Sequence, residues 1–81
     1  MMEQKKFESL KRYIEENLIG KIDIKDLVAE VYNLFQDYRI SSDQEDELYK
    51  LVDPEDKIDS PSMLWYDDHG CVDMWNFVES L

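Results

Sequence analysis

The residues most able to do chemistry gather near the C-terminal end, around His69 and Cys71, the one histidine and the one cysteine of the chain. Asp67, Asp68 and Asp73 lie beside them in the sequence. Structural zinc takes four nitrogen or sulfur ligands, which one His and one Cys cannot supply. A nucleophilic cysteine needs a base that the fold places against its thiol, and a histidine two residues away on one turn is poorly placed for this role. We therefore expect no catalytic residue and no zinc. A carboxylate site that includes His69, for another divalent cation, is the alternative.

Other ligand-binding motifs are also missing from the sequence. The two glycines lie far apart, so there is no glycine-rich phosphate loop. The acidic segment 53–62 contains no glycine and spaces its acids irregularly, which excludes a calcium loop of the EF-hand type and leaves only a weak cation site as an alternative. We predict a protein that is not an enzyme and has no cofactor and no resident metal.

Charge is distributed very unevenly along the chain. Residues 1–42 carry 8 acids and 7 bases, whereas residues 43–81 carry 12 acids and 2 bases, so nearly all of the net charge of -11 lies in the second half. Such a charge repels nucleic acids and anionic membranes, so we expect neither as a direct partner. The acids either solubilise one face of the protein or meet a basic protein partner.

The acidic second half also contains both tryptophans of the chain and half of its ten aromatic residues. Trp and Tyr are enriched among the residues that dominate the binding energy of interfaces, although Trp65, Tyr66, Trp75 and Phe77 could instead complete the core. Aromatic anchors beside carboxylates suit a partner rich in Lys and Arg. The predicted partner-binding residues are Asp43, Glu45, Asp46, Glu47, Asp53, Glu55, Asp56, Asp59, Trp65, Tyr66, Asp67 and Asp68.

The elements that must position these residues are helices. A chain of 81 residues is of a size to form one domain, residues 1–81, with a single core. One cysteine cannot form an internal disulfide framework, and without a signal-like segment we expect a cytoplasmic protein. The expected fold is all-α, a small antiparallel bundle of three to four helices.

The strongest periodic signal covers residues 22–38. Asp23 is a good N-cap, Asp26 adds negative charge to the first turn, and Ile22 with Leu27 can form a hydrophobic staple. A broad apolar stripe follows at steps of three and four, which predicts the central helix of the bundle. Its members are Ile24, Leu27, Val28, Val31, Leu34, Phe35 and Tyr38.

A first helix is predicted over residues 3–18, with Phe7, Leu10, Ile14 and Leu18 on its inner face. Gly20 suits the left-handed residue that closes such a helix. Because the connection to the central helix is short, we expect these two helices to form an antiparallel hairpin.

A capping box of Ser42 and Glu45 predicts the start of a third helix, which Pro54 ends. The inner face of this helix is predicted to hold Leu48, Tyr49, Leu51 and Val52. For the C-terminal segment we favour a helix over 71–81 with Val72, Trp75, Val78 and Leu81 inward. The alternative is a hairpin that pairs 63–66 with 71–75 through the turn-like 67–70.

Residues 7–52 resemble the small acidic immunity proteins of the colicin D type. Those proteins begin with a helix, turn into a second helix that bears aromatic residues, and continue into an acidic helical segment. The residues that carry the resemblance are Phe7, Leu10, Ile14, the turn 20–22, Asp26, Leu27, Tyr32 and Phe35.

The resemblance implies an antiparallel helical bundle that covers the basic active site of a tRNA-cleaving toxin domain. The charge distribution by itself favours the same role, because a compact acidic domain can occupy the groove in which a nuclease binds nucleic acid. We therefore predict an immunity-type inhibitor of a nuclease toxin. The alternatives are a phage-encoded nucleic-acid mimic that inhibits a host defence nuclease and a non-enzymatic acidic adaptor.

Overall fold

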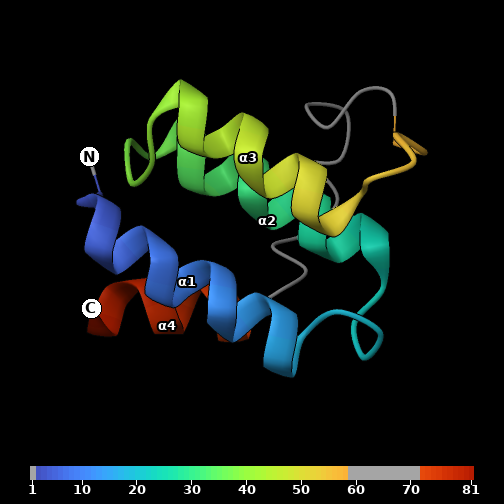
Figure 1. The fold of residues 1–81 in the computed structure, drawn as a ribbon, viewed down its shortest axis with the longest axis horizontal. Helices are drawn as coiled ribbons and strands as arrows, with labels where there is room; N and C mark the ends of the chain where they lie inside the picture. The colour runs from blue at the N-terminus through green and yellow to red at the C-terminus, as the bar shows by residue number, and fades with distance from the viewer. Residues whose placement is uncertain (1, 59–71) are drawn as a thin grey trace.

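A computed structural model of the chain describes residues 2–58 and 72–81. These ranges contain four helices and no strand: α1 (Gln4–Asn17), α2 (Ile24–Gln36), α3 (Ser42–Val52) and α4 (Val72–Ser80). Successive helices reverse direction, as Figure 1 shows. The predicted all-α bundle is confirmed.

The helices form two layers, with α2 beside α3 in one and α1 beside α4 in the other (Figure 1). Helix α3 also packs against α1, and α4 against α2. The predicted hairpin of the first two helices is wrong, because the Cα atoms of α1 and α2 nowhere approach within 8 Å. The connection over residues 18–23 is long enough to carry the chain from one layer to the other. Gly20 lies in this connection at φ +83, the left-handed conformation that was predicted for it.

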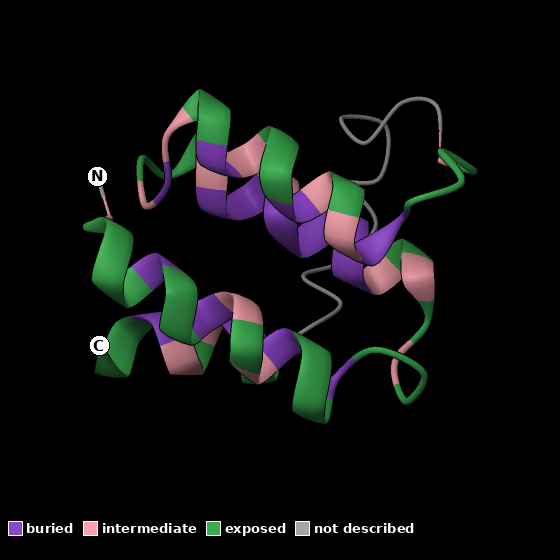
Figure 2. Cartoon of the chain, viewed as in Figure 1, coloured by how far each residue is buried: buried purple, intermediate pink, exposed green. Residues whose placement is uncertain are grey.

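Helix α2 is the centre of the bundle, as its apolar stripe predicts. Every residue from Leu27 to Leu34 is buried except Tyr32, so this helix is covered on nearly all sides (Figure 2). Its N-terminus is capped as predicted, because the Asp23 carboxylate accepts a hydrogen bond from the Lys25 N–H at 2.9 Å. Around it the core is completed by Phe7, Leu10, Ile14, Leu18, Ile40, Leu48, Val52, Met74 and Val78.

The first and last helices pack together through aromatic side chains. The Tyr13 ring of α1 stacks on the Phe77 ring of α4, with centroids 4.2 Å apart and planes inclined by 10°. The helix predicted for the C-terminal segment is confirmed, and the hairpin is excluded because residues 72–75 are helical.

The inner face of α4 differs from the predicted one. Met74 and Val78 are buried, Trp75 is half-buried and Leu81 is 37% exposed. Steps of three drift around a helix of 3.6 residues per turn, whereas a step of four keeps Met74 and Val78 on one face. The predicted inward side chain of residue 72 and the strand 63–66 lie outside what the structure describes.

Helix α3 begins one residue earlier than predicted. The N-cap is Ser41, whose hydroxyl accepts from the Gln44 N–H, while the Gln44 side chain accepts from the Ser41 N–H at 2.9 Å. The capping box therefore uses Ser41 and Gln44 rather than Ser42 and Glu45. This register buries Gln44, whose amide also donates to the Met2 carbonyl at 2.9 Å and ties the N-terminus to α3.

Helix α2 ends at Gln36 in a Schellman motif with an unusual residue at its left-handed position. The Arg39 N–H donates to the Leu34 carbonyl and the Tyr38 N–H to the Phe35 carbonyl. Tyr38 adopts φ +60 and is 80% exposed, so the prediction that it lies on the inner face is wrong. The turn imposes a left-handed backbone there, and this directs the side chain away from the core.

Replacing Tyr38 with glycine should stabilise the protein. Glycine relieves the left-handed strain of about 1–2 kcal/mol, offset in part by its larger entropy in the unfolded chain, so we expect a gain of about 0.5–1 kcal/mol in urea unfolding. Gly20→Ala is the matched converse: nothing lies within 4 Å of a Cβ there, so only backbone strain opposes it. It should destabilise by about 1 kcal/mol. A loss of stability in Tyr38→Gly would show that the exposed ring contributes to the fold.

Candidate partner-binding surface

The predicted surface is built by α3 and by the turn that follows it, residues 53–58. Of its exposed acids, Asp43 and Asp46 on α3 and Asp56 in the turn form no ion pair within the described ranges 2–58 and 72–81. Glu55 pairs with Lys57 at 3.4 Å, but both side chains are mostly exposed and the contact is weak. Three carboxylates are therefore free to meet a partner.

The charge of Glu47 is partly balanced within the protein. Its carboxylate accepts a hydrogen bond from the Lys11 ammonium of α1 at 2.6 Å, and Lys11 also lies 3.6 Å from Glu8. The bond with Glu47 raises the pKa of Lys11, so this lysine stays charged. Glu47 thus joins α3 to α1 and contributes less free charge than its neighbours.

Glu45 is half-buried and supports a neighbouring tyrosine. The Tyr49 hydroxyl donates a hydrogen bond to the Glu45 carboxylate at 2.7 Å, one turn earlier on α3. Desolvation raises the pKa of Glu45, although the bond from Tyr49 opposes the shift. Desolvation also raises the pKa of Tyr49, and the adjacent Glu45 raises it further. The Tyr49 side chain is therefore held neutral and in one orientation.

Asp53, predicted as a partner-binding acid, is instead largely buried, with 6% of its surface exposed. Its carboxylate accepts hydrogen bonds from the backbone N–H groups of Lys57 and Ile58, both at 2.9 Å. Its carbonyl accepts from the Asp56 N–H at 3.0 Å, which closes a tight turn over Pro54. Asp53 thus shapes the surface by holding the turn against α3.

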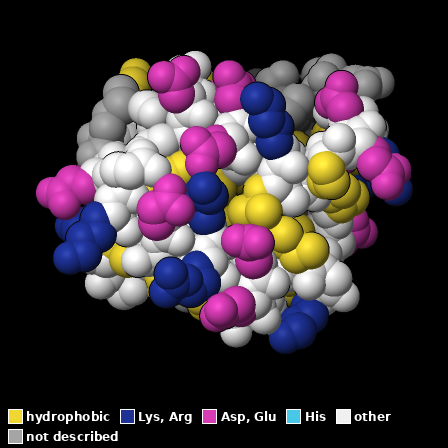
Figure 3. Space-filling model, viewed as in Figure 1, with side chains coloured by type: hydrophobic (Ala, Val, Ile, Leu, Met, Phe, Trp, Pro, Cys, Tyr) yellow, Lys and Arg dark blue, Asp and Glu magenta, His cyan; other side chains and the backbone are white. Residues whose placement is uncertain are grey.

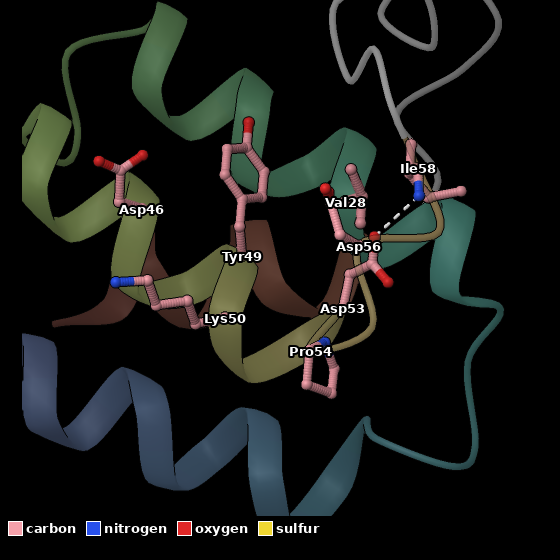
Figure 4. A pocket seen from close by; sticks show the side chains of 8 residues that line it. All are labelled: Val28, Asp46, Tyr49, Lys50, Asp53, Pro54, Asp56 and Ile58. Atoms are coloured by element: carbon pink, nitrogen blue, oxygen red, sulfur yellow. Dashed lines mark hydrogen bonds between the residues drawn. The ribbon is translucent and has the colours of Figure 1, made fainter.

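Between α3 and this turn lies a pocket of about 570 Å³. In Figure 4 Tyr49 lies between Asp46 at one end and the turn at the other, and the dashed line marks the bond from Ile58 to Asp53. Its lining residues are Val28, Asp46, Tyr49, Lys50, Asp53, Pro54, Asp56 and Ile58. Apolar groups and carboxylates therefore border the same hollow.

Acids do not form an unbroken patch on the face seen in Figure 3. Acidic side chains are interspersed with Lys and Arg, and apolar side chains are exposed between them. The candidate surface is therefore distinguished by the unpaired acids at its pocket, and not by a high density of acids over the whole face.

The remaining predicted residues divide between described and undescribed segments. Asp59, Trp65, Tyr66, Asp67 and Asp68 lie outside the described residues, as do His69 and Cys71. Asp73 is exposed on α4, and in the described part of the chain no three His, Cys, Asp or Glu side chains group as metal ligands would.

Sequence reasoning missed the pocket itself. Val28 was predicted for the apolar stripe of the central helix, Lys50 was not among the predicted binding residues, and Ile58 lies in the segment 53–62, which was considered only for its acids. Only the proline turn hinted that the chain folds back here, since Pro at the second position of a turn is common. The fold-back depends on the Asp53 carboxylate, and its partners Lys57 and Ile58 have no sequence signal.

Comparison of the chain with protein-family models, with curated proteins and with solved structures found no match. None of the helices in the described ranges is long and apolar enough to cross a membrane.

Removing the Asp53 carboxylate should loosen the turn. We expect Asp53→Ala to lower the free energy of unfolding by about 1–3 kcal/mol, because two backbone N–H groups lose a charged acceptor. Asp53→Asn keeps one acceptor oxygen, so its free energy of unfolding should fall by about half as much. The control is Glu55→Ala in the same turn, which should change stability by less than about 0.5 kcal/mol in urea unfolding. If Asp53→Ala lowered the free energy of unfolding no more than Glu55→Ala does, the role of Asp53 in holding the turn would be contradicted.

Tyr49 should make the protein sensitive to alkali. Its pKa is raised in the folded state, so above about pH 10 the unfolded chain releases a proton that the folded protein retains. Stability should therefore fall as the pH rises above this value, and less steeply in Tyr49→Phe. Glu45→Gln, which removes the charge but leaves the ring half-buried, should keep the wild-type slope in this range, because burial alone still raises the pKa of Tyr49 in the folded state. Equal slopes of melting temperature against pH for wild type and Tyr49→Phe between about pH 9 and pH 11 would refute the assignment.

Proposed function

We propose that this protein is an inhibitor that binds the basic nucleic-acid-binding surface of a nuclease and acts as the immunity protein of a tRNA-cleaving toxin domain. The observation that carries the proposal is the pair of unpaired carboxylates, Asp46 and Asp56, on either side of an apolar pocket. Unpaired charge can attract a basic partner over a distance, and the pocket supplies area that excludes water once the partner has docked.

The charge distribution supports the same role. The surface lies in the half of the chain that carries 12 acids and 2 bases, so its field attracts cationic proteins and repels nucleic acids. A protein that covers a nuclease active site in this way needs no catalytic residue of its own. The resemblance of residues 7–52 to colicin D-type immunity proteins supports the toxin as the target.

Helix α3 and the turn are suited to such a role because they are held rigidly. The capping box, the Lys11–Glu47 pair and the Asp53 hydrogen bonds fix this surface from three sides. A preorganised surface loses little entropy on binding, and this favours affinity. An acidic adaptor would share the charge, and a phage-encoded mimic would share both the charge and the target class.

Capture from the native source at about 50 mM and about 300 mM salt should retain a basic nuclease, more weakly at the higher salt because exposed charges are then screened. The variant to compare with wild type is Asp46→Asn/Asp56→Asn. Asparagine tolerates the left-handed conformation of residue 56, which has φ +53, so the turn should survive. We expect affinity for the captured nuclease to fall at least about tenfold, mainly through slower association.

The matched control is Glu15→Gln/Glu16→Gln, which removes the same charge from exposed positions on α1. It should bind within about twofold of wild type, since it changes only the net charge. Neutralising Glu45, Asp46 and Glu47 together is a poorer test, because Glu45 and Glu47 also make structural contacts. Equal losses of affinity in the two double variants would show that binding depends only on the net charge of the protein. Capture of a neutral or acidic protein at both salt concentrations would favour the adaptor.

A further inference from the structure

The pocket between α3 and the turn combines three kinds of group that together suit one chemical class of side chain. Pro54 and Ile58 contribute accessible apolar surface above the buried Val28, Tyr49 contributes an aromatic ring, and carboxylates lie at the edges. Its volume of about 570 Å³ is within the range of about 300–1,000 Å³ typical of ligand sites. It can therefore admit one long side chain together with part of the segment that bears it.

The aromatic ring is held in place before any partner arrives. The 2.7 Å hydrogen bond to Glu45 fixes the Tyr49 hydroxyl, and the body of the ring is packed against the core. A ring that is already ordered loses little entropy when a ligand stacks on it. Such a ring attracts a flat cation through its π-electron face.

The charges at the pocket are unbalanced in favour of a cation. Asp46, Asp53 and Asp56 contribute three carboxylates against the single ammonium of Lys50. Asp53 is 94% buried; each oxygen accepts one backbone N–H, and no cation lies within 4 Å of it in the described part of the chain. Asp53 therefore adds negative charge beside the pocket, while the exposed Asp46 and Asp56 are the carboxylates that can accept from a ligand.

We propose that this pocket receives an arginine side chain from the protein partner. The aliphatic stem of arginine would lie against Ile58, above the buried Val28, while its planar guanidinium would stack on the Tyr49 ring and donate to the carboxylates. Arginine is favoured over lysine because its guanidinium is planar, weakly hydrated and able to donate two parallel hydrogen bonds to a carboxylate. The inference depends on the proposed function only for the basic character of the partner.

The test is an NMR titration of the full-length, isotope-labelled protein with the capped peptide Gly-Gly-Arg-Gly-Gly and its Lys and Gln analogues. The arginine peptide should shift the methyl signals of Val28 and Ile58 and the ring signals of Tyr49. It should bind at least about fivefold more tightly than the lysine peptide, and the glutamine peptide should cause no shift there, because it lacks the charge.

Two variants separate the charge from the ring. Asp46→Asn/Asp56→Asn should weaken binding of the arginine peptide at least about fivefold, whereas Glu15→Gln/Glu16→Gln should leave it unchanged. Tyr49→Leu keeps an apolar wall but removes the stacking surface, so it should abolish the preference for arginine over lysine while circular dichroism confirms that the helices are intact. Equal shifts with the arginine and lysine peptides, or shifts spread over the acids of α1, would overturn the proposal.

The titration contains no nuclease, so its outcome is independent of the capture experiment. Arginine binding at the pocket without capture of a nuclease would support the pocket and refute the proposed inhibitor. Capture of a nuclease that depends on Asp46 and Asp56, with no peptide shift at Val28 or Ile58, would support the inhibitor and refute the arginine pocket.

Discussion

The burial of helix α2 is the constraint on which the rest of the fold depends. A helix that is apolar over such a wide arc cannot be covered by a single partner, so it is packed against α3 on one side and α4 on another. Helix α1 closes the bundle through α3 and α4 without approaching the α2 backbone. This packing also determines where the candidate surface lies, because α3 buries Leu48 and Val52 against α2 and turns its acids outward.

The acids of α3 do not all serve the same purpose. Glu47 ties two helices together, Glu45 orients a tyrosine, and Asp53 organises a turn. Only the carboxylates outside these contacts combine exposure with freedom to bind. This division explains how a chain of net charge -11 can fold compactly while it keeps an attractive field for a cationic partner. Repulsion among the acids is reduced where a hydrogen bond or a lysine meets them.

The candidate surface also depends on the geometry of two turns, one at each end of α3. The Schellman motif that ends α2 brings the chain back along α2 as α3, although it requires a left-handed tyrosine. The second turn, after α3, uses Pro54 and the Asp53 carboxylate to fold residues 57 and 58 back toward α2. Both turns contain a residue other than glycine at positive φ, Tyr38 and Asp56. Strain of this kind persists only where the surrounding contacts hold it in place.

The sequence by itself determined the helical class, the central position of α2, the Asp23 cap and the inner face of α1, because apolar periodicity and capping chemistry act within a few residues. Only the tertiary structure decided which helices are neighbours, which of Ser41 and Ser42 caps α3, and that Glu30 is buried, since these depend on contacts between distant segments. The candidate site divides in the same way. The excess of acid could be predicted from composition. Which carboxylates are engaged and which are free depends on contacts with Lys11, Tyr49 and the backbone of the turn, and only the fold brings these groups to the acids.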